Sequence, residues 1–569
     1  MGVDVMPVTR QLSALPSLVL GDWATAPDAE LGEVFTRRWV VDFILDLVGY
    51  TPDRDLASLT IVEPSCGSGA FVLPIIERLI ESCLRHKRSA VDATVAVRAF
   101  DLLEVNVALA RKAVVALLAE HAIATDEAEQ LAAGWIATGD FLLTEHDGVS
   151  ADFVVGNPPY IRLENVPAAV TEAYRRACPT MRGRSDVYVG FFEVGLDLLK
   201  PDGALAFVCA DRWMHNEYGA ALRDFVTRRY NVDAIITMHD VDAFETEVSA
   251  YPAITVIRDG APQPTHIVEA TRNFTANDTN RIAAWVRGKT RTPTATKSFR
   301  ASRLERWHRG PGLWPSGGPA QLSLLAKLES QFAPLEDSAT RTRVGIGVAT
   351  GCDEVYITTR IDVVEPDRLM PLLRASDLTD GTAEWSGSYL INPWANRSLV
   401  DLADYPLLGD YLNAHRKRLQ QRHTAQKNLS RWYRTIDVVD AELQQRPKLL
   451  LPDLKAAAHP VLDSGTTYPH HNLYYVVSDA WDLEVLGGIL LSDIANLFVG
   501  AYCVKMRGGC YRFQAQYLRQ IRVPSPDSIA PEVARSLAAA FRSRDQDAAT
   551  EAVAHAYGVD LADIRRARK

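Results

Sequence analysis

Short apolar segments alternate with amphipathic helical patterns between residues 61 and 258, and this alternation limits the possible folds more than any other feature of the chain. The helical patterns cover 71–86, 105–121 and 188–199. Strands that alternate with helices form βαβ units, so the sequence predicts an α/β fold with a mostly parallel, doubly wound sheet. Ligands of such sheets bind beyond the carboxyl ends of the strands. The predicted strands are LTIVEPS, AVRAFDLL, GWIATGDF, DFVVGNPPY, GALAFVCAD, VDAIITMHD and AITVIRD.

A glycine-rich turn, EPSCGSG at residues 63–69, follows the first predicted strand. Gly67 and Gly69 allow the backbone to approach a ligand closely, and Glu63 adds a carboxylate beside that approach. The turn has neither the G-x-G-x-x-G spacing nor a Walker lysine, so it suits a cationic or amino-bearing ligand better than a phosphate. Taken alone, an ordinary tight strand–helix turn is an equally good interpretation.

The next two predicted strands also end in acidic residues. Asp101 stands where nucleoside-binding α/β folds hold ribose hydroxyls. Asp140 can accept a hydrogen bond from an adenine amino group while Phe141 covers the face of the ring. Each acid could instead cap a helix. Acids at three successive strand ends of one sheet edge favour a ligand site.

The fourth predicted strand leads into Asn157, Pro158, Pro159 and Tyr160. The prolines fix the backbone and remove two N–H donors, which leaves the carbonyls of this turn able to accept hydrogen bonds. The Asn157 side-chain oxygen and the Pro158 carbonyl can together accept both protons of a planar amino group. Tyr160 offers a face for stacking. This motif is the strongest functional signal in the chain.

Together these motifs resemble the amino-group methyltransferases that use S-adenosylmethionine, specifically the gamma-class, Taq-type N6-adenine DNA methyltransferases of restriction–modification systems. The resemblance covers most of the chain, with cofactor motifs before the catalytic motif and a long region after it. It implies a Rossmann-like methyltransferase domain with a mostly parallel sheet, followed by a mixed α/β target-recognition domain. It further implies S-adenosylmethionine as cofactor and N6 of a flipped-out adenine in duplex DNA as methyl acceptor.

The resemblance also assigns roles to individual residues. ELGEVFT at residues 30–36 is similar to the family's N-terminal cofactor motif, with Arg37 in place of the usual proline. Phe244 matches the aromatic residue that packs against the flipped base, and a buried core phenylalanine is the alternative. The catalytic residues are thus expected to be Asn157, Pro158, Pro159, Tyr160 and Phe244. The expected cofactor-binding residues are Thr36, Glu63, Ser65, Cys66, Gly67, Gly69, Asp101, Asp140, Phe141 and Asn157.

Composition along the chain suggests the domain organisation. Residues 261–320 are rich in Pro, Gly, Thr and Arg and are expected to form an irregular linker. Residues 1–260 are then the catalytic domain, and 321–526 the target-recognition domain that binds DNA. Residues 527–569 have the spacing of helices, two of them by our interpretation.

The chain carries 61 Lys+Arg against 71 Asp+Glu, a net charge of −10, which excludes a uniformly basic surface but not a basic cleft. Residues 411–436 contain seven Lys/Arg, residues 500–522 contain five, and both stretches lack acids. Aromatic residues lie among these basic ones, a pattern that suits phosphate and base contacts, although a solvated helix face is the alternative. The residues expected to contact DNA are Arg416, Lys417, Arg418, Arg422, Arg431, Lys505, Arg507 and Arg512.

Other features limit the remaining possibilities. The seven cysteines form no CxxC pair, so the sequence indicates neither a disulfide framework nor a metal site. The N-terminus lacks the pattern of a signal peptide, and acids interrupt the most apolar stretch, 483–504, so we expect a cytoplasmic protein without a membrane partner. We see no nuclease constellation. The expected partners are double-stranded DNA and a separate cognate restriction endonuclease, and the expected state is a monomer.

The function that these motifs predict is site-specific adenine methylation of DNA, in a restriction–modification or phage-defence system. Two alternatives remain at the level of sequence. The Asn-Pro-Pro-Tyr motif also occurs in methyltransferases that act on RNA or on protein glutamine, because it recognises an amino group rather than DNA. A catalytically silent DNA-binding specificity subunit is the other alternative, and the intact motif at 157–160 argues against it.

Overall fold

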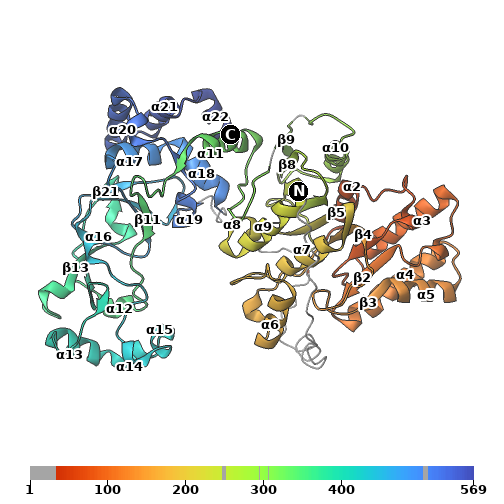
Figure 1. The fold of residues 1–569 in the computed structure, drawn as a ribbon, viewed down its shortest axis with the longest axis horizontal. Helices are drawn as coiled ribbons and strands as arrows, with labels where there is room; N and C mark the ends of the chain where they lie inside the picture. Colours follow the sequence, from red (N-terminus) through yellow and green to blue (C-terminus); the bar gives the residue numbers. More distant parts are fainter. Residues whose placement is uncertain (1–33, 246–251, 294, 306, 504–510, 569) are drawn as a thin grey trace, which may run out of the picture. The chain divides into compact units, whose positions relative to one another are not determined.

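The computed structural model describes residues 34–245, 252–293, 295–305, 307–503 and 511–568. The chain divides into two compact units, residues 1–319 and residues 320–569. In Figure 1 the first unit runs from red to green and the second from green to blue. We describe each unit by itself.

The first unit is built on a nine-stranded sheet of order β3-β2-β1-β4-β5-β7-β6-β8-β9. β7 and β9 are its two reversed strands, so the predicted mostly parallel sheet is confirmed. The strand order changes direction at β1 and β4, which is where such sheets bind ligands. The strands are β1 (Ile61–Glu63), β2 (Val97–Asp101), β3 (Ile136–Thr138), β4 (Ala151–Gly156), β5 (Leu199–Ala210), β6 (Tyr230–Thr237), β7 (Pro252–Asp259), β8 (Thr265–Ala270) and β9 (Phe299–Leu304).

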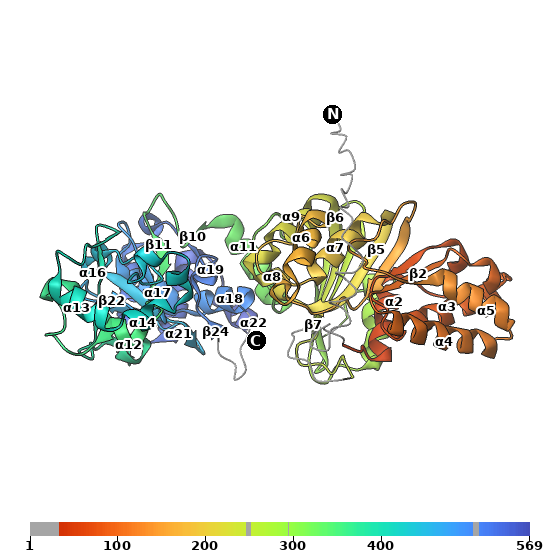
Figure 2. The same ribbon diagram turned by 90° about the horizontal axis from the view of Figure 1, so that it is seen from below.

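Helices cover both faces of this sheet, as Figure 2 shows. The side chains of β5 alternate between the two faces: Ala206 belongs to the core shared with α2, α3 and α10, whereas Phe207 contacts Phe192 of α7, with ring centroids 5.1 Å apart. The helices of the unit are α2 (Arg38–Val48), α3 (Val72–His86), α4 (Glu104–Glu120), α5 (Thr125–Trp135), α6 (Ala168–Ala177), α7 (Tyr188–Asp197), α8 (Arg212–His215), α9 (Ala220–Arg229) and α10 (Ala276–Val286).

The expectation that residues 261–320 form an irregular linker is wrong for much of that stretch. β8, α10 and β9 lie within it, and both strands join the main sheet. Thr275 and Asp278 form a capping box that starts α10. Val268 and Phe299 are fully buried in the core of the first unit. The Pro- and Gly-rich composition is that of the loops around β8, α10 and β9. The short apolar runs of these three elements form regular structure because they are buried in the core.

The second unit contains two four-stranded sheets and smaller two-stranded ones, which confirms a mixed α/β region. One sheet has the order β11-β23-β19-β21 and the other β12-β16-β13-β22. Their strands are β11 (Arg343–Ile346), β12 (Ile357–Thr358), β13 (Leu369–Leu373), β16 (Tyr389–Ile391), β19 (Lys448–Pro452), β21 (Val461–Asp463), β22 (Tyr468–Pro469) and β23 (Leu473–Val477). The smaller sheets pair β10 (Ala333–Pro334) with β25 (Arg522–Val523), β14 (Leu378–Thr379) with β15 (Thr382–Ala383), β17 (Trp394–Ala395) with β18 (Ser398–Leu399), and β20 (Leu454–Lys455) with β24 (Tyr511–Arg512).

The second unit also contains helices. The C-terminal tail, expected to contain two helices, contains three, because residues after Gly558 form a further short helix. Among the described helices none is long and apolar enough by itself to cross a membrane, and α17 and α18 pass that test only as a pair bent by 62°. The helices are α11 (Pro319–Gln331), α12 (Asp353–Tyr356), α13 (Pro406–Ala414), α14 (Arg416–Gln420), α15 (His423–Gln426), α16 (Ala441–Gln445), α17 (Leu483–Leu491), α18 (Asp493–Tyr502), α19 (Ala515–Leu518), α20 (Pro531–Ser543), α21 (Gln546–Tyr557) and α22 (Leu561–Arg568).

Candidate active site

A pocket lies in the first unit at the carboxyl ends of β1 to β4. Its empty space is about 950 Å³, open solvent included. The structure thereby brings together residues from five separate sequence motifs. The expected site residues that line the pocket are Thr36, Ser65, Cys66, Gly67, Asp101, Asp140, Phe141, Asn157 and Pro159.

The glycine-rich turn after β1 depends on backbone conformations that favour glycine. Gly67 has φ +51° and Gly69 φ +110°. A Cβ at Gly67 would meet nothing within 4 Å, so the backbone angle, not crowding, explains the glycine there. The Gly67 N–H donates to Asp101 Oδ2 at 2.8 Å, and the Leu103 N–H donates to Asp101 Oδ1 at 2.9 Å. Asp101 therefore fixes the shape of the turn.

Glu63 is buried beside the pocket rather than in its lining. It is 1% exposed, and its carboxylate makes no hydrogen bond or ion pair with another described side chain. Burial and the nearby charge of Asp101 raise the pKa of Glu63 well above its ordinary value. Gly156 makes room for the carboxylate, since a Cβ at that position would lie 3.2 Å from Glu63 Oε1. A cationic ligand in the pocket would favour the ionised form of Glu63.

Asp140 and Phe141 are held by residues that sequence reasoning missed. The Tyr174 hydroxyl donates to Asp140 Oδ2 at 2.7 Å, and burial raises the pKa of Asp140. Phe141 stacks on Phe191, with ring centroids 5.5 Å apart and an interplanar angle of 23°. Tyr174 and Phe191 line the pocket and come from α6 and α7. In the sequence both belong to the apolar faces of helices, which gives no signal of a site.

Asn157 has the most informative hydrogen bonds of the pocket. Its Nδ2 donates to the Val34 carbonyl at 2.9 Å and to Thr36 Oγ1 at 3.1 Å. These contacts determine the orientation of the amide, because a backbone carbonyl can only accept. The Asn157 Oδ1 is buried and has no hydrogen-bond partner among the described residues. The turn after β4 thus presents a fixed hydrogen-bond acceptor.

Tyr160 and Phe244 lie next to each other but outside the pocket lining. Their rings meet edge to face, with centroids 6.4 Å apart, and Tyr160 meets Tyr188 in the same way. The Tyr160 hydroxyl donates to the Val208 carbonyl at 3.4 Å. Phe244 is 4% exposed and its backbone bridges to Thr36. Tyr160 keeps a partly exposed ring, whereas the described contacts of Phe244 are those of a core residue that supports Tyr160.

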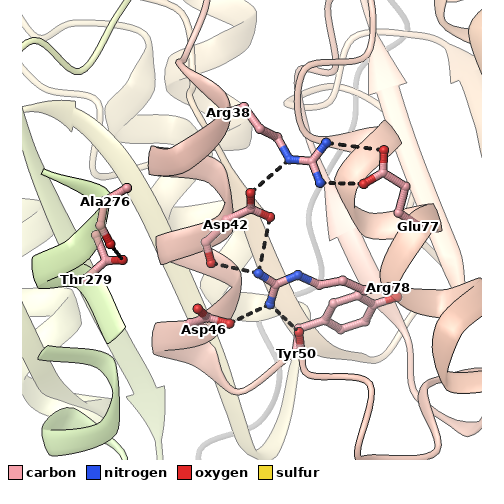
Figure 3. A network of polar contacts seen from close by, with 8 residues as sticks. All are labelled: Arg38, Asp42, Asp46, Tyr50, Glu77, Arg78, Ala276 and Thr279. Carbon is pink, nitrogen blue, oxygen red and sulfur yellow. Dashed lines mark hydrogen bonds and ion pairs between the residues drawn. The ribbon is translucent and has the colours of Figure 1, made fainter. Parts of the chain in front are cut away.

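A polar network anchors the helix that follows Thr36, as Figure 3 shows. Arg38 pairs with Asp42 on α2 and with Glu77 on α3. Arg78 of α3 donates to the carbonyl of Asp42 at 3.0 Å and to its carboxylate at 3.2 Å. The network joins α2 to α3, which begins after the glycine-rich turn. It therefore positions the two halves of the pocket wall relative to each other.

The chain matches known proteins over nearly its whole length. The family model described as Eco57I restriction-modification methylase matches residues 107–244. The Type II methyltransferase M.PaeR7I of Pseudomonas aeruginosa is 43% identical over 534 residues, which cover 93% of this chain and 92% of that protein. M.XhoI of Xanthomonas vasicola, also a Type II methyltransferase, is 42% identical over 547 residues, with 94% and 98% covered. The chain belongs to the Type II restriction–modification methyltransferases.

A solved structure shows the same fold. The Type IIL restriction-modification enzyme MmeI, determined in complex with DNA, is 12% identical with a TM-score of 0.55, and the match covers 93% of this chain and 75% of that one. The two Type II methyltransferase relatives do not favour an RNA or protein-glutamine methyltransferase, nor a catalytically silent specificity subunit.

The second unit of this Type II methyltransferase contains the basic residues expected to contact DNA. Arg416, Lys417 and Arg418 are exposed on α14. Arg416 lies over the Trp432 ring and Arg431 over the Trp394 ring. Arg418 pairs with Glu354, and Arg512 with Asp453. Lys505 and Arg507 lie outside the described residues.

Arg422 has a structural role instead. Its guanidinium donates to the carbonyls of Leu419, Thr350, Trp432 and Arg434 at distances of 2.8 to 3.1 Å. All three guanidinium nitrogens are thus occupied by the protein's own backbone. We therefore remove Arg422 from the residues expected to contact phosphate.

Proposed function

We propose that this protein transfers a methyl group from S-adenosylmethionine to N6 of adenine in duplex DNA, as the modification enzyme of a restriction–modification system. The observation that carries the proposal is the fixed orientation of Asn157, whose buried Oδ1 has no described hydrogen-bond partner. The motif order supports the gamma class, because the cofactor turn at 63–69 precedes the catalytic motif at 157–160 and a long region follows.

The pocket fits the proposed cofactor by the chemistry of its lining. Asp101 would hold the ribose hydroxyls, and Asp140 with Phe141 the adenine ring. Glu63, buried and without a described cationic partner, suits the positive charge of the methionine part. When bound, S-adenosylmethionine supplies an electrophilic methyl group on its sulfonium.

The catalytic motif would act by holding the acceptor nitrogen. The lone pair of adenine N6 is delocalised into the ring, which makes it a poor nucleophile. Asn157 Oδ1 and the Pro158 carbonyl would accept its two hydrogens and aim the lone pair along the line of transfer. Such positioning and electrostatic stabilisation lower the barrier without a covalent enzyme intermediate.

The target base must leave the duplex to reach this motif. Flipping a base out of the stack costs a few kcal/mol. The partly exposed ring of Tyr160 would recover about 1–3 kcal/mol by stacking. Exposed basic residues of the second unit, Arg416 and Lys417 among them, would contact the phosphates. A cognate endonuclease would be the enzyme from which this methylation protects the host DNA.

The proposal is tested by incubating the purified protein and labelled S-adenosylmethionine with duplex DNA, with RNA or with protein, in three separate reactions. We expect label only in DNA, and sequencing to find N6-methyladenine at one recurring site. Asn157→Ala protein serves as the inactive control. Label in RNA or protein alone, or methylated cytosine in the DNA, would overturn the proposal.

A further inference from the structure

Three side chains that commonly bind metals meet in the second unit: Asp353, His470 and His471. Their ligand atoms all lie within 4.8 Å of one another. His470 Nε2 is 3.0 Å from Asp353 Oδ2 and 3.0 Å from His471 Nδ1. Asp353 begins α12 and the histidines follow β22, so segments 117 residues apart in the sequence form the cluster.

In a neutral His470, the contact with Asn472 leaves the Nε2 lone pair facing the Asp353 carboxylate. Its Nδ1 lies 3.1 Å from Asn472 Oδ1, an oxygen that also accepts from the backbone N–H of Ala375 at 3.4 Å. An amide oxygen can only accept, so Nδ1 carries the proton of a neutral His470. The Nε2 lone pair then faces the carboxylate of Asp353, and two acceptors at 3.0 Å repel each other. A cation placed between them removes this repulsion.

We propose that Asp353 Oδ2, His470 Nε2 and His471 Nδ1 bind a divalent transition-metal ion of the zinc type. Two imidazole nitrogens and one carboxylate oxygen are a donor set that Zn²⁺ uses, with water in the fourth position. His470 is 5% exposed, whereas His471 is exposed and open to that water. The Asn472 contact is the outer-shell hydrogen bond that fixes the tautomer of a ligating histidine.

The ion would add a side-chain link between two segments of the second unit that backbone pairing already joins, since β11 pairs with β23 and the His471 N–H donates to the Val348 carbonyl. Val348 and His470 already form an isolated bridge. The Thr350 hydroxyl donates to Asp353 Oδ1 at 2.5 Å, and the Thr350 carbonyl accepts from Arg422 at 3.1 Å. Through these contacts the metal would stabilise the part of the fold that carries the basic helix α14. None of its three ligands is among the residues that line the pocket of the first unit.

The test uses the purified full-length chain, stripped of metal with a chelator and then titrated with Zn²⁺ alone. We expect one Zn²⁺ to remain bound per chain after desalting and the Tm to rise on Zn²⁺ addition. Co²⁺ at the same site should give visible absorption bands. His471→Ala, at an exposed position that tolerates truncation, should lose both effects, whereas the control His555→Ala, exposed on α21, should keep them.

A graded variant separates metal binding from an ion pair. Asn472→Ala removes the outer-shell acceptor and should weaken Zn²⁺ binding by about 10–100-fold. If Zn²⁺ fails to raise the Tm of the stripped protein, or if His471→Ala binds as much Zn²⁺ as the unaltered chain, the proposal is wrong.

Discussion

The two units of this methyltransferase use their charged residues in opposite ways. In the first unit, Glu63, Asp101 and Asp140 stand at the ends of neighbouring parallel strands and converge beside one pocket. In the second unit, basic residues that are neighbours in the sequence have different surroundings: Lys417 is exposed, whereas Arg422 donates to backbone carbonyls. The sequence predicts where a charged residue lies when it ends a strand of a regular sheet. It does not predict this for a charged residue in an irregular segment.

The largest expected effect tests the acceptor at the centre of the first unit. Asn157→Ala removes the fixed Oδ1, and by analogy with the loss of one oxyanion contact we expect kcat to fall by about 10²–10³-fold. Cofactor affinity, measured by calorimetry, should change little. Asn277→Ala, exposed on α10, is the matched control and should keep full turnover. If Asn157→Ala keeps near-normal turnover, Asn157 Oδ1 is not the acceptor on which catalysis depends.

Asp101 tests whether the strand-end acids bind the cofactor. Asp101→Asn keeps the size of the side chain but removes the charge that accepts from the Gly67 N–H. Hydrogen bonds to charged groups contribute about 1.5–3 kcal/mol, so S-adenosylmethionine affinity should fall by about 10–100-fold. Asp126→Asn, exposed on α5, should leave the affinity unchanged. If Asp101→Asn binds S-adenosylmethionine as tightly as the unaltered chain, Asp101 does not contribute to cofactor binding.

Tyr160 tests the stacking of the flipped base. Tyr160→Ala removes its partly exposed ring, which should cost about 1–3 kcal/mol in binding of the target base. Fluorescence of 2-aminopurine at the target position measures the flipped state. Tyr160→Phe should behave like the unaltered protein, because the hydroxyl makes only a long contact of 3.4 Å to Val208. Loss of flipping in both variants would contradict stacking as the role of the ring.

Lys417 and Arg422 test the difference between an exposed basic residue that contacts DNA and one that stabilises the fold of the second unit. If Lys417 contacts a phosphate, Lys417→Ala should reduce the slope of log affinity against log salt by about 1 and leave the Tm unchanged. Arg422→Ala should lower the stability by about 1–3 kcal/mol, because it leaves backbone carbonyls without donors. Lys112→Ala, exposed on α4, is the control. A Tm that drops for Lys417→Ala and not for Arg422→Ala would reverse the assignment.

The smallest expected effect is a pH dependence of stability in the first unit. Burial lowers the pKa of His239, but the charge and the hydrogen bond of Asp211, 2.6 Å away, together with the charges of Asp240 and Glu269, outweigh burial and raise the pKa. His215 also faces Asp211. A raised histidine pKa stabilises the fold fully below the unfolded value of about 6.5, and this stability is lost as the pH rises through the folded value.

The comparison of the unaltered chain with His239→Gln measures that effect. The Tm of the unaltered chain should exceed that of His239→Gln most at about pH 6, where the histidine is charged in both states. The difference should shrink as the pH rises above the folded pKa. A difference that does not vary with pH would show that His239 contributes packing only.

Sequence patterns located much of the first unit and less of the second. The predicted strands from 61 to 258 correspond to β1–β7, and most of the expected cofactor residues line one pocket, because strand ends of a parallel sheet share an edge. Tyr174 and Phe191 escaped notice because their helical spacing is also that of a core residue. β8, α10 and β9 were hidden by loops rich in Pro and Gly.

The sequence by itself determined the order of β1 to β7, the glycine turn and the Asn-Pro-Pro-Tyr motif, since these depend on local spacing and backbone preference. The tertiary structure decided which polar atoms are already satisfied. It left Asn157 Oδ1 without a described partner, used Arg422 internally, and joined Asp353 to His470 across 117 residues. Hydrogen bonds between distant segments follow from packing, and no sequence spacing encodes them.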